Sequence, residues 1–321
     1  MKKTLVIILM SCLVLILVAC GDGSGGAESI QTYTLAAASF SLPVSWQQNE
    51  TTESDSENVR GELQFASDDG YLSAYCNAYP IDGSFEDFVK SWQEDNEKYE
   101  KENYSLTKDS EEFFSFDNAE GYIATFISDD EEVAKQNMKK SSIYLYSDGL
   151  LYWFESASID ADRLMNSIRE SLVIDPAKLG GYKVSIEDAE LTLHPSFASQ
   201  KPNSAEENVQ HFASSLDTYT VCAINSEEKR YSNYDNLKSL ATFLESTIFM
   251  TDKAEIESPL GTTYYIKGKY QERPMYIGAI ETPTNFITIM MFADNEFPED
   301  RDLLKDVLAS AELAEAEEDG E

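Results

Sequence analysis

The sequence predicts an α+β protein made of two similar domains, each a mainly antiparallel sheet packed with about two helices. Three observations lead to this prediction. Short motifs recur in the same order in the two halves of the chain. Segments that alternate between polar and apolar residues outnumber segments with helical periodicity. In each half one helical segment interrupts the strands and another follows them, without strict strand–helix alternation.

The internal repeat is carried by motifs whose spacing drifts slowly along the chain. Residues 40–46 (Phe-Ser-Leu-Pro-Val-Ser-Trp) align with residues 191–197 (Leu-Thr-Leu-His-Pro-Ser-Phe). Three further matches are Tyr75-Cys76 with Val221-Cys222, Ile143-Tyr144-Leu145 with Met275-Tyr276-Ile277, and Ser171 with Ser310. Proline and paired glycines punctuate residues 175–181, so we predict a first domain over 30–178 and a second over 179–314.

The elements of the first copy follow in order. Residues 33–42 alternate as a strand does, and residues 63–65 and 71–79 form a predicted hairpin around Asp68-Asp69-Gly70. Ser84 is placed to cap a helix that runs toward Glu102. The helix has one apolar stripe, formed by Phe85, Phe88, Val89 and Trp92. Strands are expected near 112–117 and 120–128, a hairpin over 139–158, and a closing helix near 160–172.

The second copy repeats this order. A strand is expected over 182–193 and a helix from Asn233 to Thr247. Further strands are predicted near 253–258, 261–270, 274–281 and 285–293. The closing helix is expected from Pro298 to Ala311, because proline is accepted in the first turn of a helix.

The N-terminus predicts export and lipidation. Lys2 and Lys3 precede an apolar run that ends in Leu17-Val18-Ala19-Cys20, and this ending resembles the bacterial lipoprotein signal. The resemblance implies cleavage after residue 19, acylation of Cys20 with chains such as palmitate, and attachment to the cell membrane facing outside the cytoplasm. The alternative, a retained transmembrane anchor, has roughly 16 apolar residues where a spanning helix needs about 20.

The remaining terminal segments and the net charge narrow the choice of partners. Residues 1–19 are the expected signal peptide, 20–29 a flexible lipidated tether, and 315–321 an acidic tail. The formal net charge is −35, which argues against nucleic acid as a partner. Hydrophobic residues make up 42% of the chain, enough for one or two packed cores.

The order of elements resembles the PsbP-like family, whose members pack helices on a largely antiparallel sheet. Residues 40–46 resemble the family's opening strand, and residues 191–197 resemble it more loosely, since His194 and Phe197 depart from the pattern. The resemblance implies a non-catalytic accessory or binding domain. It assigns no functional residue to this chain.

Motifs and residue types that carry out catalysis or bind metal ions are sparse in this sequence, so we predict no catalytic residues, no cofactor and no metal site. Only His194 and His211 occur, both in the second copy, so neither a repeated triad nor a histidine-rich metal site can be built, and a single site in the second domain stays open. A loosely held calcium ion at residues 129–132 is the alternative to a solvated loop. Cys76 and Cys222 occupy equivalent strands, which leaves two buried free thiols or an interdomain disulfide.

Aromatic residues supply the candidate binding surface. Strand-like segments hold Tyr144, Tyr146, Tyr152, Trp153 and Phe154 in the first copy, and Tyr264, Tyr265, Tyr270, Tyr276 and Phe286 in the second. Alternate residues face opposite sides of a sheet, so one side packs and the other either packs under a helix or binds a peptide, glycan or apolar ligand. We single out Tyr144, Tyr146, Tyr264 and Tyr276 as candidate binding residues.

Two functions fit these features. The first is a membrane-anchored, non-enzymatic lipoprotein whose tandem domains bind another envelope or secreted protein. The alternative is a lipoprotein that holds a small molecule, glycan or cation between or within the copies. The sequence leaves the oligomeric state and the orientation of the two domains open.

Overall fold

The computed structural model describes residues 29–49, 56–116, 119–131, 135–136, 138–201 and 209–314. The predicted signal peptide, almost all of the predicted tether, and the acidic tail lie outside these residues. Within them no helix has the length and apolar character needed to cross a membrane.

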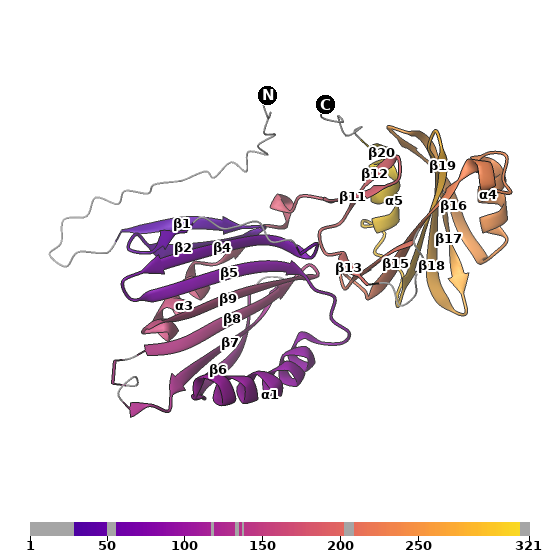
Figure 1. Ribbon diagram of the computed structural model, residues 1–321. Helices are drawn as coiled ribbons and strands as arrows, with labels where there is room; N and C mark the ends of the chain where they lie inside the picture. The colour runs from indigo at the N-terminus through magenta and orange to yellow at the C-terminus, as the bar shows by residue number, and fades with distance from the viewer. Residues whose placement is uncertain are drawn as a thin grey trace, which may run out of the picture.

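Each half of the chain forms one seven-stranded and one three-stranded sheet, both antiparallel, packed with helices (Figure 1). In the first half the large sheet has the order β3 (Gln47–Gln48), β4 (Val59–Ser67), β5 (Gly70–Ala78), β9 (Leu150–Ile159), β8 (Met138–Ser147), β7 (Ala119–Ser128), β6 (Leu106–Phe116). The small sheet contains β1 (Ile30–Leu35), β2 (Ala38–Pro43) and β10 (Val173–Ile174). The helices are α1 (Phe85–Tyr104) and α3 (Ala161–Ser171).

The second half has the same topology strand for strand. Its large sheet has the order β13 (Ala198–Gln200), β14 (Val209–Ser214), β15 (Thr220–Glu228), β19 (Asn285–Ala293), β18 (Arg273–Glu281), β17 (Gly261–Tyr270), β16 (Phe249–Ser258). The small sheet contains β11 (Tyr182–Ile186), β12 (Ala189–Leu193) and β20 (Glu312–Leu313), and the helices are α4 (Leu237–Glu245) and α5 (Leu303–Ala309). Short 3-10 turns occupy Pro176–Lys178 and Lys229–Tyr231. The predicted fold class is therefore confirmed.

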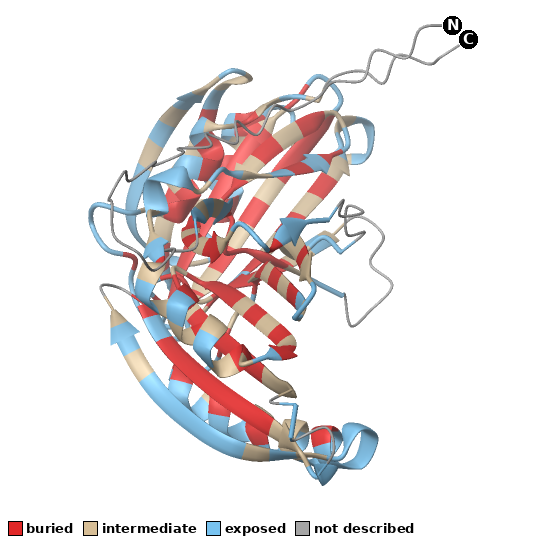
Figure 2. Ribbon diagram, turned by 90° about the vertical axis from the view of Figure 1, so that its left-hand side faces the viewer, coloured by how far each residue is buried: buried red, intermediate tan, exposed pale blue. Residues whose placement is uncertain are grey.

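Both faces of each large sheet carry apolar residues. Buried and less buried residues alternate along β5, β9, β15 and β19, whereas β7, β8 and β18 are buried over most of their length (Figure 2). In the first copy Phe40, Phe154 and Ile168 belong to the cluster on the side of α3, while Phe85 and Tyr122 belong to the cluster under α1. The second copy divides its core in the same way between α5 and α4. This two-sided burial explains why the central strands contain so many apolar residues.

A shared hydrogen bond supports the duplication at the level of single atoms. The backbone N–H of Ser41 donates to Ser171 Oγ at 3.0 Å, and the N–H of Thr192 donates to Ser310 Oγ at 2.9 Å. In both copies this bond ties the central strand of the small sheet to the end of the closing helix. The pairing of Ser171 with Ser310 in the sequence therefore corresponds to a repeated structural contact.

Several predicted local features are confirmed. Ser84 caps α1 by accepting a hydrogen bond from the N–H of Asp87 at 3.1 Å. The hairpins at residues 68–69 and 148–149 join β4 to β5 and β8 to β9. Their positions were readable because glycine follows aspartate at each turn.

Two predicted strands are wrong, because residues 33–42 and 182–193 each form a hairpin. The chain turns at Ala36, with φ of 51°, and at Glu187, with φ of 52°. Both turns span two residues, so the polar–apolar alternation continues through them and gives no sign of a reversal. Neither turn carries the glycine that usually marks such a position.

Two helix starts in the second copy are also wrong. The predicted helix over 233–247 begins at Leu237, where Asn236 and Ser239 form a reciprocal capping box. The predicted helix over 298–311 begins at Leu303, after the Asp302 side chain accepts a hydrogen bond from the N–H of Lys305. Pro298 precedes the helix, because the capping side chain sets the first turn.

Candidate functional site

The four tyrosines proposed from sequence do not form one surface. Tyr144 is buried at 6% exposure and Tyr276 is completely buried, whereas Tyr146 and Tyr264 are half-buried. Tyr144 and Tyr146 lie on the α1 side of the first sheet. Tyr264 lines a pocket of about 310 Å³ beside α4 in the second copy. These four residues therefore lie in three separate settings, the α1 side of the first sheet, the pocket beside α4 and the core on the side of α5, and their role in binding stays a prediction.

Tyr276 has an opposite orientation to its supposed equivalent, Tyr144. It belongs to the core on the side of α5, stacks on Phe297 at 4.3 Å between ring centroids, and accepts a hydrogen bond from the N–H of Phe297 at 2.8 Å. The sequence match between residues 143–145 and 275–277 is displaced, because a shift of one residue moves a side chain to the other face of a sheet.

A row of five aromatic rings crosses the first sheet on the α1 side, and we call it the aromatic row. Each member lies directly opposite the next on the neighbouring strand. From β6 through β7, β8 and β9 to β5 the members are Phe113, Tyr122, Tyr144, Trp153 and Tyr75. Successive ring centroids are 4.9, 6.4, 5.6 and 5.8 Å apart, distances at which aromatic pairs attract.

Helix α1 covers only part of this row. It packs across β6 and β7 (Figure 1), and its Trp92 meets Tyr144 edge-on at 4.7 Å. The far end, formed by Trp153 and Tyr75, remains half-exposed. Nε1 of Trp153 is itself buried and has no hydrogen-bond partner among the described residues. The middle of the row, Tyr122 and Tyr144, is therefore buried, whereas Phe113 at one end is 40% exposed and Trp153 and Tyr75 at the other end are partly exposed.

The far end of the row is extended along β5 by two more tyrosines. Tyr71 is 46% exposed and Tyr79 is 43% exposed. Residues 71, 75 and 79 point to the same side of the strand, about 13 Å apart in succession. We call Tyr71, Tyr75, Tyr79 and Trp153 together the aromatic face. Large apolar groups gathered at an exposed site are a feature of protein interaction surfaces.

Acidic side chains border the aromatic face. Glu62 lies opposite Tyr75 on β4. Near Tyr71, Lys140 forms ion pairs with Glu100 at 2.7 Å and Glu155 at 3.3 Å. Burial raises the pKa of Glu155, although Lys140 opposes this effect. The second carboxylate oxygen of Glu100 is buried without a hydrogen-bond partner among the described residues, so the border carries more negative than positive charge.

The aromatic face was missed from sequence, although a signal for it was present. Residues 71–79 were predicted as a strand, and tyrosines at positions 71, 75 and 79 must then share one side. Whether that side was open depended on where α1 packs. The helix is 20 residues long, but its direction across the sheet has no signature in the sequence.

The two histidines lie apart in this structure, and one of them contacts a buried serine. His194 Nδ1 accepts a hydrogen bond from the N–H of Ser196 at 3.2 Å and lies 2.8 Å from Ser196 Oγ. Ser196 is completely buried and its hydroxyl pairs with Ser214 at 2.7 Å. His211 lies apart in β14, and the Ser196 hydroxyl is enclosed by its neighbours.

His194 should make the stability of the protein fall between pH 6.5 and pH 4. Burial, assisted by the nearby Arg301 guanidinium, lowers the pKa of His194 from 6.5 to about 4. In this window the unfolded chain binds a proton that the folded chain excludes, so acidification removes about 2 to 3 kcal/mol of stability. Urea unfolding at pH 7 and pH 4.5 should show a smaller loss for His194→Asn, which keeps an acceptor for Ser196. An equal loss in both proteins would contradict this assignment.

The remaining candidates have ordinary structural roles. Cys76 and Cys222 are free and buried, so the disulfide alternative is wrong, and burial raises the pKa of each thiol to about 12. Asp129 accepts a hydrogen bond from Thr107 at 2.7 Å, and Glu132 lies outside the described residues. Among described residues, no three His, Cys, Asp or Glu side chains are grouped to hold a metal ion.

The two copies meet through a polar junction. The Arg60 guanidinium from β4 donates to the carbonyl oxygens of Pro195 at 2.8 Å and Phe197 at 2.6 Å, and it lies 4.0 Å from the centre of the Tyr182 ring. The Asn58 side chain forms two hydrogen bonds with the backbone of Ser199, at 2.7 and 3.3 Å.

The hairpin between β8 and β9 also touches the second copy. A Cβ atom at Gly149, where φ is +75°, would lie 2.5 Å from Cβ of Ser196. Only glycine allows this close approach.

Comparisons with known proteins return little. No protein-family model matches the sequence, and no curated protein matches it. Among solved structures the chain is similar to the solution structure of cyanobacterial PsbP (CyanoP) from Synechocystis sp. PCC 6803, with 15% sequence identity and a TM-score of 0.37, over 49% of this chain and 98% of that one. Similarity at this level carries no argument about function.

Proposed function

We propose that this chain is a membrane-anchored extracytoplasmic lipoprotein that binds another protein of the cell envelope without catalysing a reaction. The aromatic face is the observation that carries the proposal. It gathers four aromatic side chains on and next to β5 and β9, at the edge of the area that α1 covers and beside the acidic border, with Tyr79 touching Phe88 of α1 at 5.3 Å between ring centroids. The lipoprotein signal ending at Cys20 supplies the anchor in this proposal, although it lies outside the described residues.

The chemistry of the face suits a protein partner. Tyrosine and tryptophan provide large contact areas together with polar tips, and they are enriched where interfaces gain most of their free energy. Ser73 and Asn77 lie between the tyrosines on the same side of β5 and can bind a partner's backbone. The acidic border and the net charge of −35 favour a partner with a basic surface.

Photocrosslinking in intact cells tests this proposal. A photoreactive amino acid replaces Ser73, in the middle of the aromatic face, and in a second strain it replaces Tyr231, which is 69% exposed in the second copy. We expect one abundant envelope protein to crosslink through position 73 and not through position 231. Changing Tyr71 and Tyr79 together to alanine should reduce the product about tenfold.

Two controls define the result. The Tyr71→Ala, Tyr79→Ala variant should keep its thermal unfolding temperature, because exposed substitutions rarely change stability by more than about 0.5 kcal/mol. Cys20→Ala removes the proposed anchor and should release the chain from the membrane fraction. Equal crosslinking from both positions, or full crosslinking by the double variant, would refute the aromatic face as the binding surface.

A further inference from the structure

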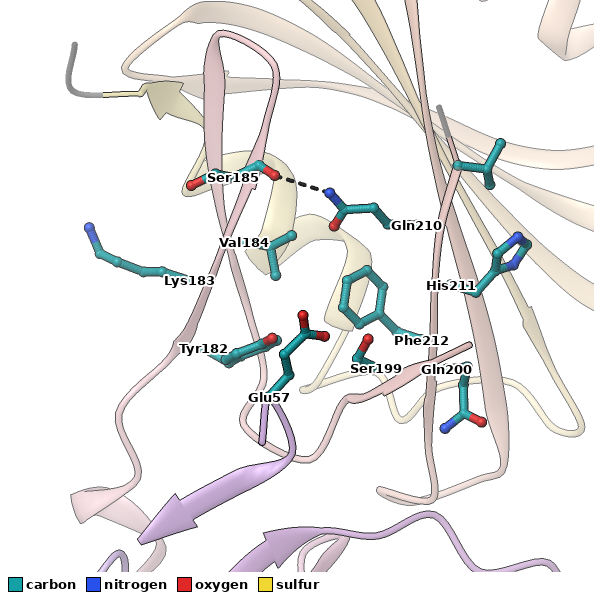
Figure 3. A pocket seen from close by; sticks show the side chains of 11 residues that line it. Glu57, Tyr182, Lys183, Val184, Ser185, Ser199, Gln200, Gln210, His211 and Phe212 are labelled. Carbon is teal, nitrogen blue, oxygen red and sulfur yellow. Dashed lines mark hydrogen bonds between the residues drawn. The ribbon is translucent and has the colours of Figure 1, made fainter. Parts of the chain in front are cut away.

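A pocket of about 400 Å³ lies between the small sheet of the second copy, its β13 and β14 strands, and Glu57 of the first copy (Figure 3). Its apolar wall contains Val184 and Phe212, both buried. Tyr182 forms another side, and the Arg60 guanidinium lies 4.0 Å from the centre of its ring. The pocket is separate from the aromatic face, which belongs to the first sheet.

The polar groups directed into this pocket are mainly acceptors. Figure 3 shows the Glu57 carboxylate in the space between Tyr182 and Phe212, and the Gln210 side chain above Phe212, extending toward Ser185 and past Val184. The Gln210 amide nitrogen donates to the carbonyl oxygen of Ser185 at 3.1 Å, which leaves its amide oxygen as an acceptor. The Glu57 carboxylate has no ion-pair partner among the described residues.

The positive charges nearby are engaged elsewhere. Lys183 points away from the pocket in Figure 3 and pairs with Glu190 and Glu312. Arg60 donates to the carbonyl oxygens of Pro195, Phe197 and Glu57. His211 also points away from the pocket. Figure 3 shows the Glu57 carboxylate as the charged group directed into the pocket, so an anion would meet its negative charge, in a protein whose net charge is already −35.

We propose that this pocket binds a small organic ammonium ion, a primary amine on a short hydrocarbon chain. The ammonium group donates hydrogen bonds to Glu57 and to the amide oxygen of Gln210. The hydrocarbon part packs against Val184, Phe212 and the ring of Tyr182. A volume of about 400 Å³ is at the small end of the range for ligand sites, which fits a compact ligand.

The test measures the thermal unfolding temperature of the full chain against ligand concentration, at pH 7 and constant ionic strength. The probe is butylamine, compared with 1-butanol and butyrate, which have the same chain length but a neutral or anionic head. A ligand that binds only the folded protein raises this temperature in a saturable way. We expect a saturable rise with butylamine alone.

Substitutions locate the effect. Glu57→Gln should weaken the apparent affinity for butylamine about tenfold or more, since it removes a charge-assisted hydrogen bond. Gln210→Leu leaves the Glu57 charge in place and should weaken the apparent affinity for butylamine several-fold. Glu94→Gln removes an exposed carboxylate on α1, and Lys183→Met removes a charge that points away from the pocket, so both should bind as the unchanged protein does.

Three results would overturn the proposal. They are the absence of a saturable rise with butylamine, unchanged affinity in both Glu57→Gln and Gln210→Leu, and a rise with butyrate that Lys183→Met abolishes. The last result would identify the pocket as an anion site. Because Gln210→Leu reports on the pocket independently, misfolding of the Glu57 variant would not prevent a decision.

Discussion

Replacing Phe40 with alanine should lower the free energy of unfolding of the first copy by about 3 to 5 kcal/mol, the usual cost of removing a buried phenylalanine ring. Phe40 is completely buried, with its ring centroid 5.0 Å from that of Phe154 and 6.1 Å from that of Phe65. It connects the small sheet to the large one, so no neighbouring side chain can fill the space. Urea unfolding followed by tryptophan fluorescence measures the loss.

The fluorescence reports on one copy, because Trp46, Trp92 and Trp153 all belong to the first half of the chain. Val44→Ala is the control, since Val44 lies beside the same strand with 49% of its surface exposed, and it should change stability by less than about 0.5 kcal/mol. Leu191→Ala removes the buried counterpart of Phe40 in the second copy. A loss below about 1 kcal/mol for Phe40→Ala would contradict the packing described for the small sheet.

Replacing Arg60 with alanine should weaken the junction by about 2 to 4 kcal/mol and separate the unfolding of the two copies. The substitution leaves the carbonyl oxygens of Pro195 and Phe197 without the charged donor that now binds them. Hydrogen bonds to charged groups contribute about 1.5 to 3 kcal/mol each. The two bonds of Arg60 contribute less than twice this amount, because the site is partly exposed and water can replace the guanidinium. Arg60→Lys should retain only part of the stability of the junction, since an ammonium group cannot reproduce the planar set of N–H donors of the guanidinium.

The measurement compares two probes during urea unfolding. Tryptophan fluorescence follows the first copy and far-ultraviolet circular dichroism follows both. We expect coincident transitions in the unchanged protein and separate transitions in Arg60→Ala. Arg163→Ala, at an exposed position of α3, is the matched control. Transitions that remain coincident and unshifted in Arg60→Ala would show that the guanidinium does not hold the copies together.

The sequence predicted elements well where their signals are local. The cap at Ser84, the apolar stripe of α1 and the hairpins at residues 68–69 and 148–149 depend on neighbours along the chain. The duplication was visible because the shared contacts, such as those of Ser171 and Ser310, constrain residue types at fixed positions. The turns at Ala36 and Glu187 were missed because their residues are unusual for a positive φ.

The candidate surfaces required contacts between distant segments. Tyr276 was grouped with Tyr144 because an alignment of the two copies that is shifted by one residue looks almost as good as the correct one. Such a shift places the side chain on the opposite face of the sheet. The aromatic face needed the path of α1 over β6 and β7. The junction pocket needed Glu57 and Gln210, which are more than 150 residues apart, to meet across two copies.

By itself the sequence determined the α+β class, the twofold repeat and most secondary structure, because periodicity, capping residues and turn residues act over a few neighbouring positions. It also determined the strong acidity and the resemblance to a lipoprotein signal. Only the tertiary structure decided which aromatic side chains are exposed, how Arg60 joins the copies, and which polar groups enclose the junction pocket. Exposure and enclosure are set by what packs above a residue, and those neighbours come from parts of the chain that local patterns do not bring together.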